Sequence, residues 1–306
     1  MKKLFSFIVL CQILLLSSWA SAEKLTFQDQ DMVVLLGNTV IERAQKHGHL
    51  ETSLTLAAGE KKLRIRNLGW SGDTVYGDAR SYFGPPQRGF NRLKTDLTEL
   101  KPNVIIICYG AVAAFEGKTG LPHFIDGYNR LLDMITQSAN PREIVLVSPP
   151  PAESHGAPMP DMTVHNQDLA LYRDAIAALA KKRKHRFADL FKAMEDSEVN
   201  LTDNGLHYSE KGYAVLAPRF LSAMGLTPAS SKQLDSKLAQ QLRDKIIAKN
   251  KLFFFQWRPA NETYLRLFRK HEQGKNAKEL EEFKPIIKAH ETEINTLKTA
   301  TLNVNS

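Results

Sequence analysis

The chain has 306 residues, a formal net charge of +8 and two cysteines, Cys11 and Cys108. A chain of this length can bury a core of its own, and two cysteines are too few for a disulfide-stapled scaffold. The positive charge comes without interleaved stacking aromatics or a known nucleic-acid module, so we do not expect nucleic-acid binding.

The first 22 residues have the pattern of a secretory signal peptide. Lys2 and Lys3 precede an apolar stretch, Leu4 to Leu16, and Ala20-Ser21-Ala22 forms a small-x-small cleavage site. The apolar stretch is short for a bilayer span, and no later stretch approaches the required length. We therefore expect an exported protein, periplasmic or extracellular, with no integral membrane segment after cleavage and with Cys108 as its only thiol.

Short apolar runs alternate with helical patterns through most of the chain. The runs are rich in Val, Ile and Leu, which is typical of strands buried on both faces, and they cover residues 33–37, 63–68, 104–109 and 143–148, with a weaker fifth at 186–190. The helical patterns cover residues 40–47, 90–100, 124–137, 168–183 and 209–224. This alternation predicts βαβ units and a parallel sheet in one α/β domain, residues 24–226.

A basic run, residues 181–186, ends the fourth of these helical patterns. Basic groups in a last helical turn suit the helix dipole and usually form a solvated face. The run is also compatible with attraction to an anionic polysaccharide or a membrane surface, because charge alone does not select a partner.

Residues 227–306 form a C-terminal helical extension. A polar, small-residue segment at 227–234 is followed by two helical stretches, which the aromatic segment 252–259 separates. We interpret the extension as an amphipathic cap docked on the α/β domain, with a carbohydrate platform around Trp257 as the alternative. Asn261 is the expected N-cap of a helix that ends at Gly274, and the tail beyond Lys278 is expected to be an exposed helix.

Small and polar residues follow each apolar run at the point where the run stops. Because ligands of parallel α/β sheets bind at the carboxyl ends of the strands, these blocks predict a site at one edge of the sheet. The blocks are Gly37-Asn38-Thr39, residues 67–74, Tyr109-Gly110-Ala111 and Ser148-Pro149-Pro150, joined by the later Leu201-Thr202-Asp203-Asn204-Gly205-Leu206-His207.

In this order and spacing the blocks resemble those of the SGNH hydrolases, also called the GDSL lipase and esterase family, and most closely an exported bacterial branch. The resemblance runs through the whole α/β domain and implies a three-layer α/β/α sandwich with a parallel, flavodoxin-like sheet. In that family a serine after the first strand is the nucleophile, a glycine and an asparagine after the next two strands form the oxyanion hole, and Asp-x-x-His ends the domain. The matching positions here are Thr39, Gly72, Val112, Asn204 and His207.

The resemblance implies a hydrolase of short acyl or acetyl esters, including those on polysaccharide, that needs no cofactor or metal. Thr39 would be the nucleophile, His207 the base and Gly72 an oxyanion donor, while Asn204 or Asp203 would orient the imidazole. Only Gly72 and His207 keep the family's residue type, so the catalytic set is degenerate. The alternative is a catalytically inactive protein of this fold that binds a glycan or another ligand in the old cleft.

Five further rim residues are candidates for substrate contacts, since loops on a rigid scaffold often carry binding groups. The partner would be a small-molecule or carbohydrate ester. Asn166 has a second interpretation as a helix N-cap, and Cys108 is expected to be a buried small hydrophobe. No His, Cys or carboxylate cluster has zinc-site spacing. The five candidates are Asn38, Gly110, Val112, His165 and Asn166.

Overall fold

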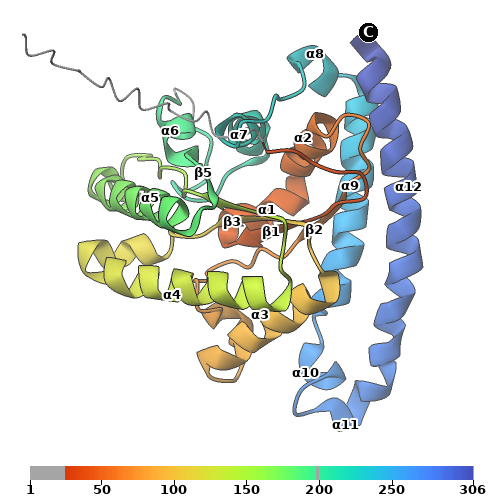
Figure 1. Cartoon of the computed structure of the whole chain (residues 1–306), viewed down its shortest axis with the longest axis horizontal. Coiled ribbons are helices and arrows are strands. Elements are labelled where there is room, and N and C mark those ends of the chain that lie inside the picture. Colours follow the sequence, from red (N-terminus) through yellow and green to blue (C-terminus); the bar gives the residue numbers. More distant parts are fainter. Residues whose placement is uncertain (1–24, 198–199, 306) are drawn as a thin grey trace, which may run out of the picture.

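The computed structural model of the protein describes residues 25–197 and 200–305 (Figure 1). The leader pattern at 1–22 lies outside the described residues. Five strands form one parallel sheet in the order β2-β1-β3-β4-β5, which is the flavodoxin-like order. All five predicted strands are confirmed: β1 Met32–Gly37, β2 Arg64–Asn67, β3 Val104–Cys108, β4 Glu143–Val147 and β5 Arg186–Ala188.

Helices follow the strands and complete a layered domain. In chain order they are α1 Thr39–His47, α2 His49–Ala57, α3 Pro86–Leu100, α4 Gly117–Ser138, α5 Thr163–Arg183, α6 Leu190–Glu195 and α7 Glu210–Ala223, with 3₁₀ turns η1 Asp78–Ser81 and η2 Ala113–Glu116. Helix α2 was not predicted. Most of its residues are buried, including Glu51, Thr52 and Ser53, so its sequence lacks the polar face that marks an amphipathic helix.

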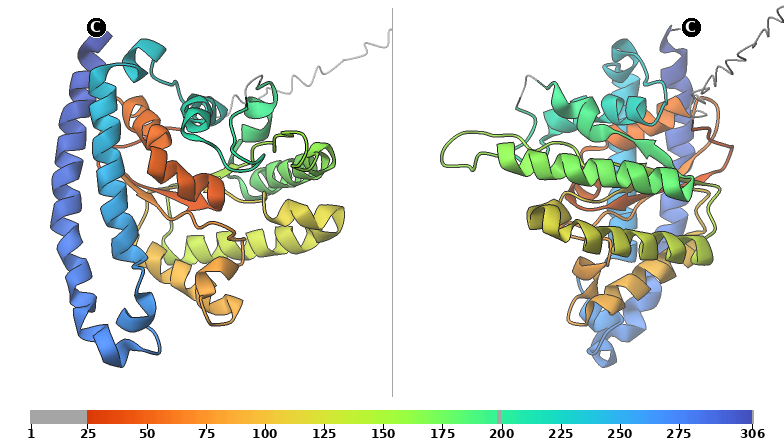
Figure 2. Two further views of the ribbon diagram at one scale, coloured as in Figure 1. Left: turned by 180° about the vertical axis from the view of Figure 1, so that it is seen from behind. Right: turned by 60° about the vertical axis from the view of Figure 1, so that its left-hand side comes forward.

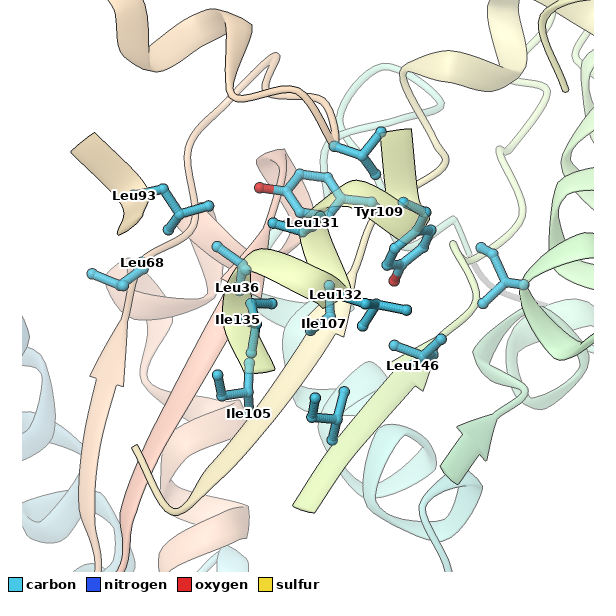
Figure 3. Close-up of a cluster of buried hydrophobic side chains, with 14 of the residues drawn as sticks. Leu36, Leu68, Leu93, Ile105, Ile107, Tyr109, Leu131, Leu132, Ile135 and Leu146 are labelled. Carbon is cyan, nitrogen blue, oxygen red and sulfur yellow. The ribbon is translucent and has the colours of Figure 1, made fainter. Parts of the chain in front are cut away.

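The two faces of the sheet are covered by different helices, which confirms the α/β/α sandwich. Side chains of Leu36, Ile105, Ile107 and Leu146 pack with α3, α4 and α5 on one face (Figure 3). The alternate residues of the same strands pack with α1, α2, α6 and α7 on the other face. Strands β1 and β3 are buried along their whole length, as expected for central strands of a parallel sheet.

The C-terminal extension is a long helical hairpin that stands beside the edge strand β2 (Figures 1 and 2). It consists of α8 Ser231–Leu234, α9 Lys237–Trp257, α10 Glu262–Leu265, α11 Lys270–Gln273, η3 Gly274–Glu282, α12 Phe283–Leu302 and η4 Asn303–Asn305. Phe253, Trp257 and Ile287 join the same hydrophobic cluster as Leu36 and Ile105. The extension therefore contributes to the core of the α/β domain.

Three expectations about the extension are wrong. The aromatic segment is the last part of α9 rather than a break between helices, because one face of it packs into the core. The expected helix from Asn261 to Gly274 is divided into α10 and α11. The tail helix α12 buries Ile287, Ile294 and Lys298 against the rest of the molecule, so it is not an exposed helix.

The surface platform at Trp257 is also not found. Trp257 is 8% exposed, and its ring packs edge-on against Trp70, with the ring centroids 5.6 Å apart. A buried ring cannot stack on a sugar. Within residues 25–197 and 200–305, no helix is both long enough and apolar enough to cross a bilayer.

Candidate active site

Thr39 lies at the junction between β1 and α1. Asn38 links them and is buried, and its carbonyl accepts hydrogen bonds from the N–H groups of Ile41 and Glu42 at 3.1 and 3.0 Å. The Thr39 hydroxyl is therefore held at a helix N-terminus, where the dipole favours negative charge. This junction lies beside the end of β3, where the strand order reverses and ligands bind in such sheets.

Gly72 brings a backbone N–H to the same hydroxyl. Its amide donates to Thr39 Oγ1 at 3.4 Å, a long hydrogen bond. The loop reaches this point because Trp70 donates its N–H to the carbonyl of Gly37 at 3.0 Å. The N–H of Gly72 thus faces the Thr39 hydroxyl oxygen.

The loop before α7 carries the histidine. An antiparallel bridge joins Thr202 to Tyr208, and the N–H of Asp203 donates to the carbonyl of His207 at 2.8 Å. Inside this loop the Asn204 Oδ1 accepts the N–H groups of Leu206 and His207 at 3.2 and 2.9 Å. The His207 side chain is consequently fixed relative to the amide of Asn204.

This arrangement decides which ring nitrogen of His207 carries the proton. Because Asn204 Oδ1 accepts two backbone N–H groups, its Nδ2 is the end that faces His207 Nδ1, at 3.3 Å. An amide NH₂ only donates, so it favours the tautomer with Nδ1 as acceptor and the proton on Nε2. A nucleophile's base needs the opposite tautomer, with Nε2 free to accept.

Asp203 is turned toward a different partner. Its carboxylate pairs with Arg43 at 3.7 Å, and its side chain is 61% exposed. Burial and the Arg43 guanidinium lower the pKa of His207 below its usual value, while the Asp203 charge opposes them. His207 is therefore neutral near pH 7.

Thr39 and His207 line one cavity of about 80 Å³. Of the other candidates, Asn38, Val112 and His165 also line it, whereas Gly72, Gly110, Asn166, Asp203 and Asn204 do not. The walls are mostly apolar, because they come from Val40, Ala111, Val112, Phe115, Pro150, Pro151, Ala152, Leu169 and Leu206. The Val112 side chain lines the cavity and brings no hydrogen-bond donor to it.

His165 and Asn166, in the first turns of α5, have different surroundings. The His165 ring stacks on Phe115 with centroids 3.9 Å apart, and its buried Nε2 has no hydrogen-bond partner. Burial lowers the pKa of His165. Asn166 uses both ends of its amide on the backbone of Ala152, each at 2.8 Å. It is not the N-cap of α5, because the helix begins at Thr163.

Gly110 and Cys108 are structural. Gly110 is buried at the end of β3, and its carbonyl accepts the N–H of Ala114 at 2.9 Å to begin η2. Burial raises the pKa of Cys108 to about 12, so the thiol stays protonated at neutral pH. This agrees with the expectation of a buried small hydrophobe.

Sequence reasoning missed Glu153, which holds the histidine loop. Its carboxylate accepts the N–H groups of Leu201 and Thr202 at 2.9 and 2.8 Å and the Thr202 hydroxyl at 2.5 Å. The Gly205 carbonyl also accepts the Glu153 N–H at 2.9 Å. A signal existed, since Glu153 follows the run of three prolines on the predicted rim.

A buried ion pair supports the Gly72 loop and was also missed. Asp73 and Arg80 are fully buried and pair at 2.6 Å, and the Tyr109 hydroxyl donates to the same carboxylate oxygen at 2.8 Å. Arg80 also donates to the Leu68 carbonyl at 2.7 Å. Arg80 thus links Leu68, before Gly72, to Asp73, directly after it.

Over the described ranges, 25–197 and 200–305, no group of three or more His, Cys, Asp or Glu residues is arranged to hold a metal ion. The described residues at this site offer the Thr39 hydroxyl, the His207 imidazole and the backbone N–H of Gly72.

The chain is similar to known proteins over much of its α/β domain. The model of the GDSL-like lipase/acylhydrolase family matches residues 46–215. No curated protein matches the chain. Among solved structures, a catalytic mutant of the acetylxylan esterase Axe2 from Geobacillus stearothermophilus is similar, with 17% identity, a TM-score of 0.51 and coverage of 66% of this chain and 97% of the other.

A second solved structure is similar over the same region. It is a putative GDSL-like lipase from Parabacteroides merdae, with 15% identity, a TM-score of 0.54 and coverage of 66% of this chain and 99% of the other. At such identities the likeness concerns the fold. Fold alone does not establish chemistry, which has to be argued from the site.

Proposed function

The chain belongs to the GDSL-like lipase/acylhydrolase family, and on that premise we propose that it hydrolyses esters through Thr39 and His207. One observation carries the proposal: the two residues, 168 positions apart in the sequence, line the same cavity, and the Gly72 N–H points at the Thr39 hydroxyl. Nucleophile, base and oxyanion donor are the parts that acyl transfer requires.

The reaction would follow the two-step course of a hydroxyl nucleophile. Thr39 Oγ1 bonds to the ester carbonyl carbon while its proton passes to His207 Nε2, and the N–H groups of Gly72 and Thr39 stabilise the oxyanion. The C–O bond then breaks as His207 returns the proton to the leaving alcohol. Water repeats the sequence on the acyl-threonine and releases the carboxylic acid, which regenerates both residues.

We infer that this hydrolase is slow. The Asn204 amide favours the His207 tautomer that cannot accept a proton at Nε2. Val112 removes the third oxyanion donor, and the loss of one donor typically costs about 10² to 10³ in kcat. Such losses do not simply multiply, because residues that act together are not additive.

The cavity favours a short acyl group. Its volume is about 80 Å³ and its walls are mostly apolar, which suits an acetyl or similarly small chain. The acetylxylan esterase of the same fold acts on acetyl esters of a polysaccharide, so we propose acetylated glycans among the substrates. The leader pattern at 1–22 supports export to the periplasm or beyond the cell as part of this proposal.

The second candidate is a binding protein without catalysis. Asn204 and Val112 favour it, since each replaces a residue type that the family's chemistry uses. Phe115, at the cavity, is 62% exposed and presents a ring on which a sugar can stack. This candidate predicts glycan binding without turnover.

The test is turnover of 4-nitrophenyl acetate by the mature protein and by Thr39→Ala and His207→Ala. We expect each variant to lose at least about 10³-fold in kcat, whereas Thr39→Ser, which removes only the crowding methyl, should keep or raise the activity. Thr98→Ala, at an exposed position on α3, is the matched control. Unchanged activity in both alanine variants would refute the site, and a wild-type protein that is inactive but binds a glycan would favour the second candidate.

A further inference from the structure

The loop that carries Gly72 is held by groups outside the catalytic set. This matters because the stabilisation that an oxyanion donor gives to the transition state depends on its position, and a displacement of about 1 Å can lower the rate up to 10²-fold. The inference that follows rests on the proposed function, since Gly72 is an oxyanion donor only in an acyl-transfer site.

Helix α1 holds the loop from one side through Glu42. The Ser71 N–H donates to Glu42 Oε2, and Ser71 immediately precedes Gly72. Glu42 lies one helical turn after Thr39, so the same turn of α1 presents the nucleophile and anchors the loop. The loop also packs closely against α1 at Gly69. A Cβ on Gly69 would lie 2.3 Å from the Glu42 backbone nitrogen, so no side chain fits at that position.

The C-terminal extension reaches the same carboxylate through Arg258. Arg258 directly follows α9, and its Nη1 donates to Glu42 Oε1 at 3.3 Å. The guanidinium carbon also lies 3.6 Å from the centroid of the Trp70 ring. Arg258 therefore acts on the loop in two ways. Its guanidinium stacks directly on Trp70 of the loop, and its charge holds Glu42, which in turn accepts the Ser71 N–H.

Arg258 has a physical effect on how firmly Ser71 is held. The Glu42 and Arg258 side chains are 18% and 24% exposed, so the pair is partly shielded from water. A carboxylate is a stronger acceptor than a neutral group, and the Arg258 guanidinium on its other oxygen holds it in orientation. The bond from the Ser71 N–H to Glu42 then fixes the peptide that joins Ser71 to Gly72.

We propose that Glu42 and Arg258 are positioning residues for the Gly72 oxyanion donor, so that the C-terminal extension completes the active site. The extension thereby acts on catalysis without touching the substrate. The residue through which it reaches the carboxylate that anchors the loop is Arg258.

The experiment measures two properties in Arg258→Met, Arg258→Lys and Glu42→Ala. The first is the exchange rate of the Ser71 backbone amide proton, followed by NMR. The second is kcat and KM on 4-nitrophenyl acetate. Arg266→Met is the matched control, because Arg266 belongs to the same extension but pairs with Glu262 at 3.9 Å.

We expect Arg258→Met to speed Ser71 exchange roughly 10-fold and to lower kcat roughly 10-fold with KM within about twofold. Glu42→Ala should change both the Ser71 exchange rate and kcat more than Arg258→Met does, and Arg258→Lys should change both less. The control Arg266→Met should change neither. A general loss of stability would instead speed exchange throughout the molecule and affect the control alike.

Each other outcome also decides the inference. Unchanged Ser71 exchange in Arg258→Met overturns it, and so does faster exchange with unchanged kcat in an active enzyme. If the wild-type protein has no esterase activity, the proposed function fails separately. The catalytic part of the inference then falls with it, and the exchange measurement decides only whether Glu42 and Arg258 hold the loop that carries Gly72.

Discussion

The side chain of Asn204 lies against the imidazole ring of His207. The Asn204 Oδ1 is occupied by two backbone N–H groups, so the NH₂ end faces the ring. Whether the nitrogen or the oxygen of the Asn204 amide faces Nδ1 therefore favours one or the other tautomer of the His207 imidazole. A site can therefore keep its geometry and still present the wrong tautomer.

Asn204→Asp should raise kcat on 4-nitrophenyl acetate. One carboxylate oxygen can keep both backbone N–H groups while the other accepts a hydrogen bond from Nδ1–H, which leaves Nε2 unprotonated and free to act as the base. The corresponding difference in serine proteases is about 10⁴ in kcat, and we expect a rise of up to that size. Asn200→Asp adds the same charge at an exposed position of the same loop and serves as the control. An equal rise in both variants, or none, would contradict the tautomer explanation.

The pH dependence of kcat/KM reports on His207. Burial first, and Arg43 second, lower its pKa, so activity should stay high below pH 6.5 and fall when the ring gains a proton at lower pH. Arg43→Gln removes a lowering charge and frees Asp203, whose charge raises the pKa. The acid limb should therefore move to higher pH.

Lys46→Gln is the control for this shift, because Lys46 lies on the same helix and its charge acts on His47. The measurement is kcat/KM from pH 4 to pH 9 for the three proteins. A limb that moves to lower pH in Arg43→Gln, or moves equally in both variants, would mean that Arg43 does not set the titration of His207.

At the scale of elements, the histidine loop depends on the segment after β4. The Glu153 carboxylate accepts hydrogen bonds from Leu201 and Thr202, and the Glu153 N–H donates to the Gly205 carbonyl. The contact is tight, since a Cβ on Gly205 would lie 2.5 Å from the Glu153 carbonyl oxygen and the residue has φ +88°. Two loops far apart in the sequence therefore act as one unit that carries His207.

Glu153→Ala should destabilise the protein by about 2 kcal/mol, because the N–H groups of Leu201 and Thr202 lose a charged acceptor. Urea unfolding measures the change, with Glu195→Ala, an exposed glutamate paired with Lys192, as the control. Esterase activity should fall as well, since the loop holds the base. Equal stability of the two variants would show that Glu153 does not anchor the loop.

Elements with a regular apolar period were predicted, and elements without one were missed. The five strands and α1, α3, α4, α5 and α7 follow their patterns, with α3 beginning at Pro86 and α4 at Gly117, earlier than expected. Gly225, at φ +75°, follows the end of α7 in the left-handed conformation that commonly terminates helices. Helix α2 is buried on nearly all sides, and the end of α9 packs aromatic side chains, so neither shows a polar face in the sequence.

At the scale of the whole molecule, the C-terminal hairpin is fastened by a buried ion pair. Lys249 of α9 donates to Glu51 of α2 and to the Ile65 carbonyl at 3.0 Å, and Asn250 donates to the other Glu51 oxygen at 2.8 Å. Burial lowers the pKa of Lys249, so the ammonium depends on this carboxylate. The pair joins the extension, the second helix and the edge strand.

Lys249→Met should cost about 3–5 kcal/mol of unfolding free energy, because it leaves the Glu51 charge buried without a cation. The double variant Glu51→Gln with Lys249→Met should recover most of that loss, since the glutamine oxygen can still accept from Asn250. Lys251→Met, at an exposed position on the same helix, is the control in urea unfolding. No recovery in the double variant would contradict a desolvation origin of the loss.

The sequence by itself determined the class of the fold and the order of the blocks around the site. Buried parallel strands require continuous apolar runs, and helices between them require amphipathic patterns, so both are written in local residue order. The blocks after the strands predicted a common edge of the sheet, and Thr39 and His207 do line one cavity there.

Only the tertiary structure decided how the site is held and tuned. The bond from Ser71 to Glu42, the contact of Arg258 with Glu42, and the bonds of Glu153 to the histidine loop each join segments that no local pattern relates. The end of the Asn204 amide that faces His207 likewise depends on backbone N–H directions. Such contacts depend on distances and orientations in the folded chain, which residue order alone does not specify.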